Sequence, residues 1–253
     1  MRSYVKMSDY PDSYEAAFWR RPFAIEAWMK SKGASEVFVI DSDVMTFADY
    51  SKEVVPLLSD GCGATLITRM KQENFVWASS LHFSYWTRDV LEDFINFCIG
   101  AYTDVAIRGK LETKYQWHIN NKKPGGISEM TLLYLWQQKT NGRVTNLAQV
   151  LDGVVADSCI TDSANYFEDE YELKSTFKRF VFKKGLPYGF NRILNKEVRF
   201  LCVHCQGKSK RMMACLQKRR NRFYRQFCYF DQYREWARSA LRLCRSRVLA
   251  RIN

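Results

Sequence analysis

Two groups of side chains in this sequence have the types and spacing of a site for a metal ion and a phosphate. The first is Asp41 and Asp43, which directly follow the apolar residues 37–40. Alternate residues of an extended segment point to the same side, so the two carboxylates can converge on one point. Carboxylates that close repel each other unless a cation lies between them, and a hard divalent cation such as Mn²⁺ or Mg²⁺ takes oxygen ligands. The alternative is a solvated turn after a strand, in which Asp41 caps the next segment.

The second group is His204, Gly207 and Lys210, each three residues after the one before. An imidazole can join two carboxylates in a metal site. A glycine lets backbone N–H groups approach a phosphate closely, and a lysine supplies a positive charge for it. The alternatives are a core or surface histidine and a run of solvated lysines. If both groups end buried strands, they can face the same crevice.

Several segments have the patterns of strands that could position these groups. Residues 36–40 contain the continuous apolar run Val-Phe-Val-Ile, typical of a strand buried on both faces of a parallel sheet. Residues 64–68 and 75–79 are predicted to be two more short strands, after a turn at residues 61–63. Residues 198–203 are apolar apart from Arg199, which predicts a buried strand that ends at His204.

The remaining regular segments have the patterns of helices. Asp12 or Ser13 can cap a helix that ends at Gly33, and Pro22 predicts a break or restart at Arg21. Thr87 can cap a second helix, whose apolar residues recur mostly three and four apart. A loop over residues 122–126 precedes a third helix over 129–139, with Ser128 as its cap. Strands interleaved with helices indicate an α/β domain with a mainly parallel or mixed sheet.

Composition and charge narrow the class of protein. The chain has 253 residues, 47% of them hydrophobic, which suits a globular domain that needs no disulfide to fold. No apolar run has the roughly 18 to 20 residues of a membrane span. The net charge of +12 lies entirely after residue 207, since 25 basic and 25 acidic residues precede that point. A nucleic-acid binder would carry basic residues across its folded surface, so no nucleic-acid partner is expected.

The basic C-terminal segment is predicted to be one long helix. Its apolar residues recur at intervals of three and four and are surrounded by arginines; they are Phe223, Phe227, Phe230, Tyr233, Ala237, Leu241, Cys244, Val248 and Ile252. Such a helix can lie on an anionic membrane through residues 218–252, or it can pack on the rest of the protein and leave its arginines solvated. We therefore expect a domain over residues 1–212 and a helical tail over 213–253. The expected location is the cytoplasm, with peripheral membrane contact if the tail docks there.

The eight cysteines predict mostly buried thiols rather than a disulfide framework. One alternative is a zinc site, because four zinc-type ligands lie within a short stretch: Cys202, His204, Cys205 and Cys215. Their spacing matches no common zinc module.

The motif of apolar residues followed by Asp41-x-Asp43, together with His204-x-x-Gly207-x-x-Lys210, resembles a known family. It is that of the metal-dependent, retaining glycosyltransferases of the GT-A fold, related to glycogenin and to bacterial lipopolysaccharide galactosyltransferases. The resemblance spans roughly residues 14–212. It implies a Rossmann-like mixed sheet flanked by helices, and a nucleotide-sugar donor, most simply a uridine diphosphate sugar. It also implies Mn²⁺ or Mg²⁺ as cofactor and a glycan, lipid-linked or protein acceptor.

The resemblance assigns roles to individual residues. It implies that Asp41, Asp43 and His204 bind the metal, and that Gly207 and Lys210 bind the diphosphate. Two further residues stand where the family contacts the donor sugar. Arg21, on the preceding helix, corresponds to a basic residue, and Glu129 corresponds to an aspartate. The alternatives are a helix-surface arginine and an acidic residue that complements a helix dipole.

The sequence departs from the family in three places. Arg211 and Met212 replace a Pro-Trp pair, and Met130 stands where an amide is common. Only about 40 residues precede Asp41, where the family has about three strands that form the nucleoside pocket. Two other functions therefore stay open. One is an inactive, truncated relative of the glycosyltransferases, and the other is a nucleic-acid binder that uses its arginine-rich tail.

Overall fold

A computed structural model describes residues 4–58, 61–66, 75, 77–140, 143–162 and 165–218, together with residues 222, 224, 226, 230, 233 and 234. The chain divides into two compact units. The N-terminal unit consists of Met1–Ser42 and Asp49–Gln149, and the C-terminal unit of Asp43–Ala48 and Val150–Asn253. The expected boundary at residue 212 stays a prediction, because most of the tail lies outside the described residues.

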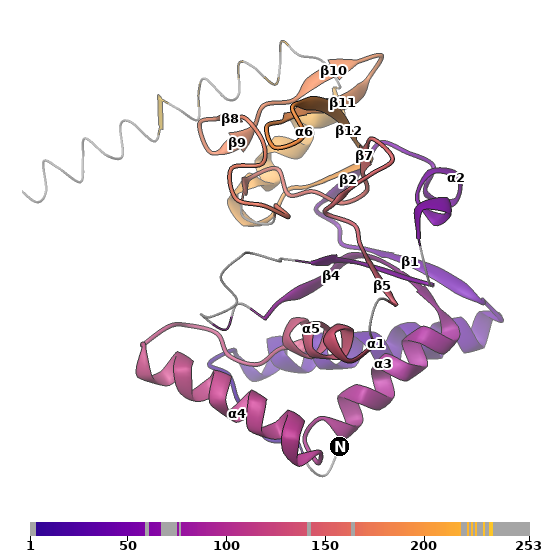
Figure 1. The fold of residues 1–253 in the computed structure, drawn as a ribbon, viewed down its shortest axis with the longest axis vertical. Helices are drawn as coiled ribbons and strands as arrows, with labels where there is room; N and C mark the ends of the chain where they lie inside the picture. Colours follow the sequence, from indigo (N-terminus) through magenta and orange to yellow (C-terminus); the bar gives the residue numbers. More distant parts are fainter. Residues whose placement is uncertain are drawn as a thin grey trace, which may run out of the picture. The chain divides into compact units, whose positions relative to one another are not determined.

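The N-terminal unit is a mixed four-stranded sheet with its longer helices on one face (Figure 1). The strands stand in the order β1-β4-β3-β5, and only β3 and β5 are parallel. Its elements are α1 (Asp12–Lys32), β1 (Glu36–Ile40), α2 (Tyr50–Glu53), η1 (Val55–Leu57), β3 (Cys62–Leu66), β4 (Ser79–Thr87), α3 (Arg88–Gly100), α4 (Val105–Asn120), α5 (Glu129–Thr140) and β5 (Val144–Asn146). The α/β class is therefore confirmed at this level.

Helix boundaries in this unit largely follow the predicted signals. Gly33 ends α1 in the left-handed conformation, with φ +63°. Thr87 precedes α3, and α5 begins at Glu129 as expected. The break predicted at Arg21 is wrong, because α1 runs continuously through Pro22. Pro22 is buried, so packing offsets the hydrogen bond that a proline removes from a helix, a loss of about 3 kcal/mol.

Of the strands predicted in this unit, one has a different environment than expected and another has a different position. Residues 36–40 do form β1, but β1 is a half-buried edge strand, antiparallel to β4. Neighbouring aromatic rings partly cover the apolar side chains of this edge strand. The ring of Phe38 lies 5.5 Å from that of Tyr50 and 4.9 Å from that of Tyr85. The strand predicted over 75–79 is in fact β4, which begins at Ser79 and is the long buried strand of the sheet.

One helix of this unit, α4, was not predicted from the sequence. α4 is weakly amphipathic and buries only Leu111 and Lys114, so apolar periodicity does not reveal it. Its cap is the better signal. The carboxylate of Asp104 accepts hydrogen bonds from the N–H groups of Ala106 and Ile107, at 2.9 and 3.0 Å.

The C-terminal unit is built mainly from short strands. A five-stranded sheet has the order β10-β11-β12-β7-β6, and its strands are antiparallel except for β12 and β7. Two strand pairs complete the unit, β13 with β2 and β8 with β9. The elements are β2 (Val44–Thr46), β6 (Val150–Leu151), β7 (Val154–Val155), β8 (Leu173–Lys174), β9 (Phe177–Lys178), β10 (Val181–Lys183), β11 (Leu186–Asn191), β12 (Lys196–Phe200), β13 (Cys202–His204), η4 (Gly207–Met212) and α6 (Met213–Gln217).

The predicted strand over residues 198–203 is buried as expected, but it is two strands rather than one. β12 ends at Phe200 and belongs to the five-stranded sheet, whereas β13 begins at Cys202 and pairs with β2. The chain changes partner at Leu201, whose N–H donates to the carbonyl of Val155 at 2.9 Å. This change of partner places His204 beside β2.

Candidate functional site

Backbone pairing brings Asp43 and His204 together in the C-terminal unit. In the antiparallel pair of β2 and β13, Val44 lies opposite His204. The ladder continues by one bond, from the N–H of Cys205 to the carbonyl of Asp43 at 2.8 Å. The two motifs found in the sequence therefore meet through strand register, although they lie far apart in the chain.

The side chains of Asp43, His204 and Lys210 form one polar cluster. His204 Nε2 lies 3.4 Å from Asp43 Oδ1, and Lys210 Nζ lies 3.2 Å from Asp43 Oδ2. The side chains of Asp43 and His204 are only 12% and 7% exposed, whereas that of Lys210 is 57% exposed. Burial alone would raise the pKa of Asp43, but the hydrogen bond from Lys210 and the charges of His204 and Lys210 outweigh it and lower the pKa. Asp43 is therefore a carboxylate at neutral pH.

The turn at Gly207 directs Lys210 toward Asp43. Gly207 begins η4 with φ +56°, a conformation that favours glycine. The N–H and the hydroxyl of Ser209 both donate to the carbonyl of Gln206, at 3.1 and 2.5 Å, and hold this turn. Apart from the residues next to Gly207 in the chain, no described residue has an atom within 4 Å of the place that a Cβ of Gly207 would occupy, so the backbone there is open to a ligand.

A cysteine that the sequence analysis did not select contacts the other nitrogen of His204. Cys159 Sγ lies 3.5 Å from His204 Nδ1. The backbone of residues 158–160 also pairs with His204. The N–H of His204 donates to Ser158 O at 2.8 Å, and the N–H of Ile160 donates to His204 O at 2.9 Å. The imidazole is thus held from both sides. Cys159 has no spacing relation to either motif, so no sequence signal identifies it.

A buried lysine, which was also not predicted from the sequence, contacts the segment that pairs with this histidine. Lys178 Nζ donates to the hydroxyl of Ser158 and stands over the rings of Tyr171 and Phe200, at 4.9 and 5.7 Å from their centres. Burial lowers the pKa of Lys178 to about 8. This ammonium group supports the segment that holds His204. Lys178 is the last residue of β9, and no pattern in the sequence marks it.

In the N-terminal unit, Asp41 pairs with Arg21. Arg21 Nη2 lies 2.5 Å from Asp41 Oδ1 and donates to the carbonyl of Leu81 at 3.2 Å. The backbone of Asp41 continues the β1–β4 ladder, with its N–H donating to His82 O at 2.7 Å. Arg21 lies on the helix before β1, as predicted. Its predicted contact with a donor sugar stays a prediction, and in the structure its partner is Asp41.

The charges of Arg21 and Asp41 act on the carboxyl group of Glu129. It is the first residue of α5 and is half-buried. Burial raises its pKa from 4.5 to about 7; the charge of Arg21 lowers it and that of Asp41 raises it. Near pH 7 this carboxyl group can therefore be protonated and donate a hydrogen bond, or be ionised and accept one.

Backbone contacts explain the glycine pair before Glu129. Gly126 has φ +140°, and a Cβ there would lie 2.3 Å from Met7 O. The N–H of Ile127 donates to this same Met7 O at 2.8 Å, and Gly125 N donates to the Asp9 carboxylate at 2.8 Å. The glycines thus let residues 7–9 pair with residues 125–127, and this pairing fixes the start of α5.

The predicted metal ligands are not assembled within one unit. Asp43 and His204 form a pair in the C-terminal unit, whereas Asp41 belongs to the N-terminal unit. Within the described ranges, no three His, Cys, Asp or Glu side chains are arranged as a metal site. The zinc alternative is also not supported at Cys202, whose buried thiol has a raised pKa and donates to Asp157 Oδ1 at 3.4 Å.

Most of the predicted tail helix lies outside the described residues. Of its predicted apolar stripe, Phe230 and Tyr233 are described, and both are exposed, at 62% and 65%. Tyr224, which the predicted stripe left out, is buried, and its hydroxyl donates to the carbonyl of Lys178. Among the described residues, no helix has the length and apolar character required to span a membrane.

Comparison of the chain with models of protein families, with curated proteins and with solved structures finds no match.

Proposed function

We propose that this chain is a glycosyltransferase of the GT-A fold, dependent on a divalent metal ion, that transfers a sugar from a nucleotide-diphosphate sugar to an acceptor hydroxyl. One observation carries the proposal. Asp43 from the first motif and His204 and Lys210 from the second meet in one cluster, with 3.4 and 3.2 Å between their polar atoms. Chance sequence matches to two motifs would have no reason to meet in this way.

The chemistry of the Asp43–His204 pair suits Mn²⁺ or Mg²⁺. A six-coordinate ion with bonds of about 2.1 Å has neighbouring ligand atoms about 3 Å apart, close to the 3.4 Å between Asp43 Oδ1 and His204 Nε2. The ligands that the structure supports are Asp43 and His204, both in the C-terminal unit, and the resemblance adds Asp41, which pairs with Arg21 in the N-terminal unit. When bound, the ion would neutralise the diphosphate leaving group.

Lys210 is suited to contact the diphosphate. Its ammonium group is tethered to Asp43 but is largely exposed, so it can exchange this carboxylate for a phosphate oxygen. The open backbone at Gly207 can approach the same phosphate group. These two groups would stabilise the negative charge that develops as the sugar leaves.

Glu129 and Arg21 are proposed to hold the donor sugar. A carboxyl group with a pKa of about 7 can accept a hydrogen bond from a sugar hydroxyl, and the nearby guanidinium of Arg21 can donate one. Retention of configuration, a uridine diphosphate sugar as donor, and a glycan, lipid-linked or protein acceptor belong to the same proposal. So does a cytoplasmic location with the tail against an anionic membrane, without a nucleic-acid partner.

The first test is the effect of Mn²⁺ on the melting temperature. A ligand at a hundred times its Kd stabilises the native state by about 2.7 kcal/mol, which would raise Tm by about 5 to 10 °C in a chain of this size. Asp43→Asn should abolish the rise. Asp152→Asn, the same substitution at an exposed turn of the same unit, is the matched control. Equal Mn²⁺ stabilisation of the wild type and of Asp43→Asn would overturn the site.

The second test uses the donor. Release of UDP from UDP-glucose or UDP-galactose should require Mn²⁺ and should fall with Lys210→Ala. Mn²⁺ binding without donor binding or UDP release would instead favour the inactive relative.

A further inference from the structure

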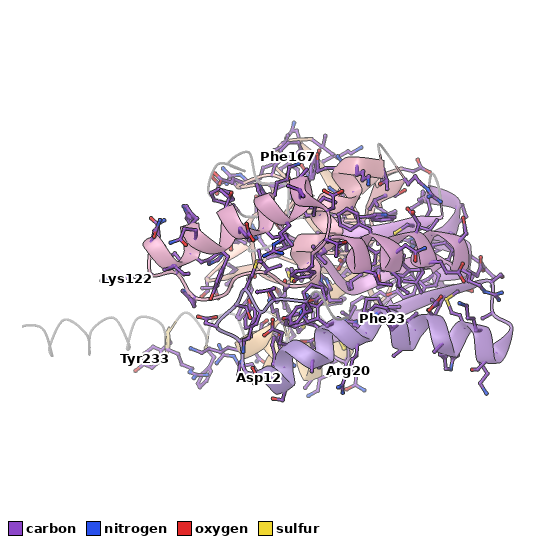
Figure 2. All side chains as sticks on the ribbon, turned by 90° about the horizontal axis from the view of Figure 1, so that it is seen from below. Asp12, Arg20, Phe23, Lys122, Phe167 and Tyr233 are labelled. Atoms are coloured by element: carbon purple, nitrogen blue, oxygen red, sulfur yellow. The ribbon has the colours of Figure 1, made fainter. Side chains whose placement is uncertain are left out.

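The N-terminal unit has a hollow that the proposed transferase site does not use. Its volume is about 460 Å³, within the range of small-molecule sites. We call it the α1 hollow, because α1 and the segment before that helix form it. The residues that determine its chemistry are Tyr4, Lys6, Glu15, Trp19, Arg20 and Phe23. Figure 2 labels two of these, Arg20 and Phe23, which lie along α1.

The polar group inside the α1 hollow is a carboxylate held in a fixed position. Glu15 is only 4% exposed. The hydroxyl of Tyr4 donates to Glu15 Oε1 and accepts a hydrogen bond from Trp19 Nε1 at 3.2 Å. Lys6 Nζ lies 3.4 Å from the other carboxylate oxygen. A buried, oriented carboxylate with a lysine beside it can bind hydroxyl groups with defined geometry.

Aromatic rings form the apolar wall of the hollow. Tyr4 packs edge-on against Trp19, with 5.8 Å between ring centres, and against Tyr102, with 5.1 Å. These contacts fix the orientation of the Tyr4 ring. Tyr4 and Phe23 are half-buried, so part of each ring remains accessible.

The charges around the hollow balance. Lys6 and Arg20 are positive, whereas Asp12 and Glu15 are negative. An anionic ligand would be repelled by the two carboxylates, and an ammonium ligand by the two cations. Arg20 is exposed and makes no ion pair with another described side chain, so its guanidinium is available to a ligand. Aromatic walls, a fixed carboxylate and balanced charge favour a neutral ring that carries hydroxyl groups, which is a sugar.

A second hollow adjoins the first at Tyr4. It has a volume of about 520 Å³ and is lined on its far side by Val105, Arg108 and Glu112. Arg108 and Glu112 form an ion pair of 2.8 Å, so this hollow is also neutral in charge. Tyr4 lines both hollows, so a ligand that occupies both would contact the Tyr4 side chain.

We propose that the two hollows that share Tyr4 bind a neutral oligosaccharide, with one sugar ring in the α1 hollow and the next part of the oligosaccharide in the second hollow. This subsite is built entirely within the N-terminal unit and does not rest on the proposed transfer reaction. If that reaction occurs, the subsite would hold a glycan acceptor or product.

The test is binding of maltotriose and cellotriose to the full chain, measured by calorimetry and by saturation-transfer NMR. We expect a Kd of about 1 mM, and about a tenfold loss in Arg20→Ala, since a hydrogen bond from a charged group is removed. Lys32→Ala, an exposed cation at the other end of α1, should bind as the wild type does. Phe23→Ala should also weaken binding, and a melting curve identifies any variant that fails to fold.

The outcomes separate this subsite from the transferase site. Asp43→Asn should retain trisaccharide binding, because Asp43 belongs to the other unit. The proposal is overturned if neither trisaccharide binds at about 10 mM, or if Arg20→Ala binds as tightly as Lys32→Ala. Tighter binding of glucose 6-phosphate or choline to the same residues would also overturn it, in favour of a charged ligand.

Discussion

Glu129 should cost the protein stability at neutral and alkaline pH, and Glu129→Gln should remove that cost. The carboxyl group is half-buried at the start of α5, and its pKa is raised from 4.5 to about 7, mainly by burial. Glutamine has nearly the same shape and stays neutral at all pH values. The substitution therefore removes the charge and leaves the packing almost unchanged.

The size of the effect follows from proton linkage. The native state holds its proton up to about pH 7, whereas the unfolded chain releases it near 4.5, so the contribution of Glu129 to stability is greatest below pH 4.5. It is lost as the pH rises through about 7. A shift of this size corresponds to about 3 kcal/mol for a fully enclosed group. Because Glu129 keeps some contact with solvent, screening reduces the expected loss to about 1 to 2 kcal/mol.

Urea denaturation at pH 4.5, 6 and 8 measures this loss. Glu129→Gln should match the wild type at the lowest pH and exceed its free energy of unfolding by about 1 to 2 kcal/mol at pH 8. Glu112→Gln is the matched control, because Glu112 is an exposed partner of Arg108 on the same unit. A difference between Glu129→Gln and the wild type that stays constant with pH would refute the reasoning. A variant that gains stability yet loses sugar transfer would mark Glu129 as a residue retained for function.

Three further perturbations follow from the structure. Gly126→Ala should lower the free energy of unfolding by about 3 kcal/mol, because φ is +140° and the new Cβ would lie 2.3 Å from Met7 O. Gly109→Ala in α4, where no described atom lies within 4 Å, should instead be stabilising by about 0.5 to 1 kcal/mol, and unfolding in urea compares the two. A chain that ends at Gln226 keeps the buried Tyr224 and should lose binding to anionic vesicles, measured by co-sedimentation, if the arginine-rich tail docks on membranes. Unchanged vesicle binding after this truncation would rule out the tail as the membrane contact, and poor folding would favour a tail that packs on the protein.

The sequence by itself determined the features that depend on neighbouring residues. Gly33 ends α1 because a left-handed residue without a Cβ costs little there. The apolar repeat after Thr87 and the cap position before Glu129 predicted α3 and α5 correctly. The types and spacing within His204-x-x-Gly207-x-x-Lys210 also indicated a polar site; His204 ends β13, and Gly207 and Lys210 lie on η4.

Features that depend on distant partners were mostly decided by the tertiary structure. The apolar run of β1 did not reveal whether strands or side chains would cover it, and β1 proved to be an edge strand. Pro22 predicted a break, but burial of the proline outweighs the lost hydrogen bond. α4 went unpredicted because it buries little and its cap, Asp104, was not recognised.

The candidate site shows the same division. That Asp43 and His204 could share a ligand was predicted from their residue types, but their meeting depends on the three-residue strand β2, which has no pattern of its own. Asp41 lies only two positions before Asp43, yet it is held in the N-terminal unit by Arg21. Cys159 reaches His204 through pairing with a remote segment. Strand register is set by the fit of whole segments, so a local pattern can name the residues of a site without determining which of them touch.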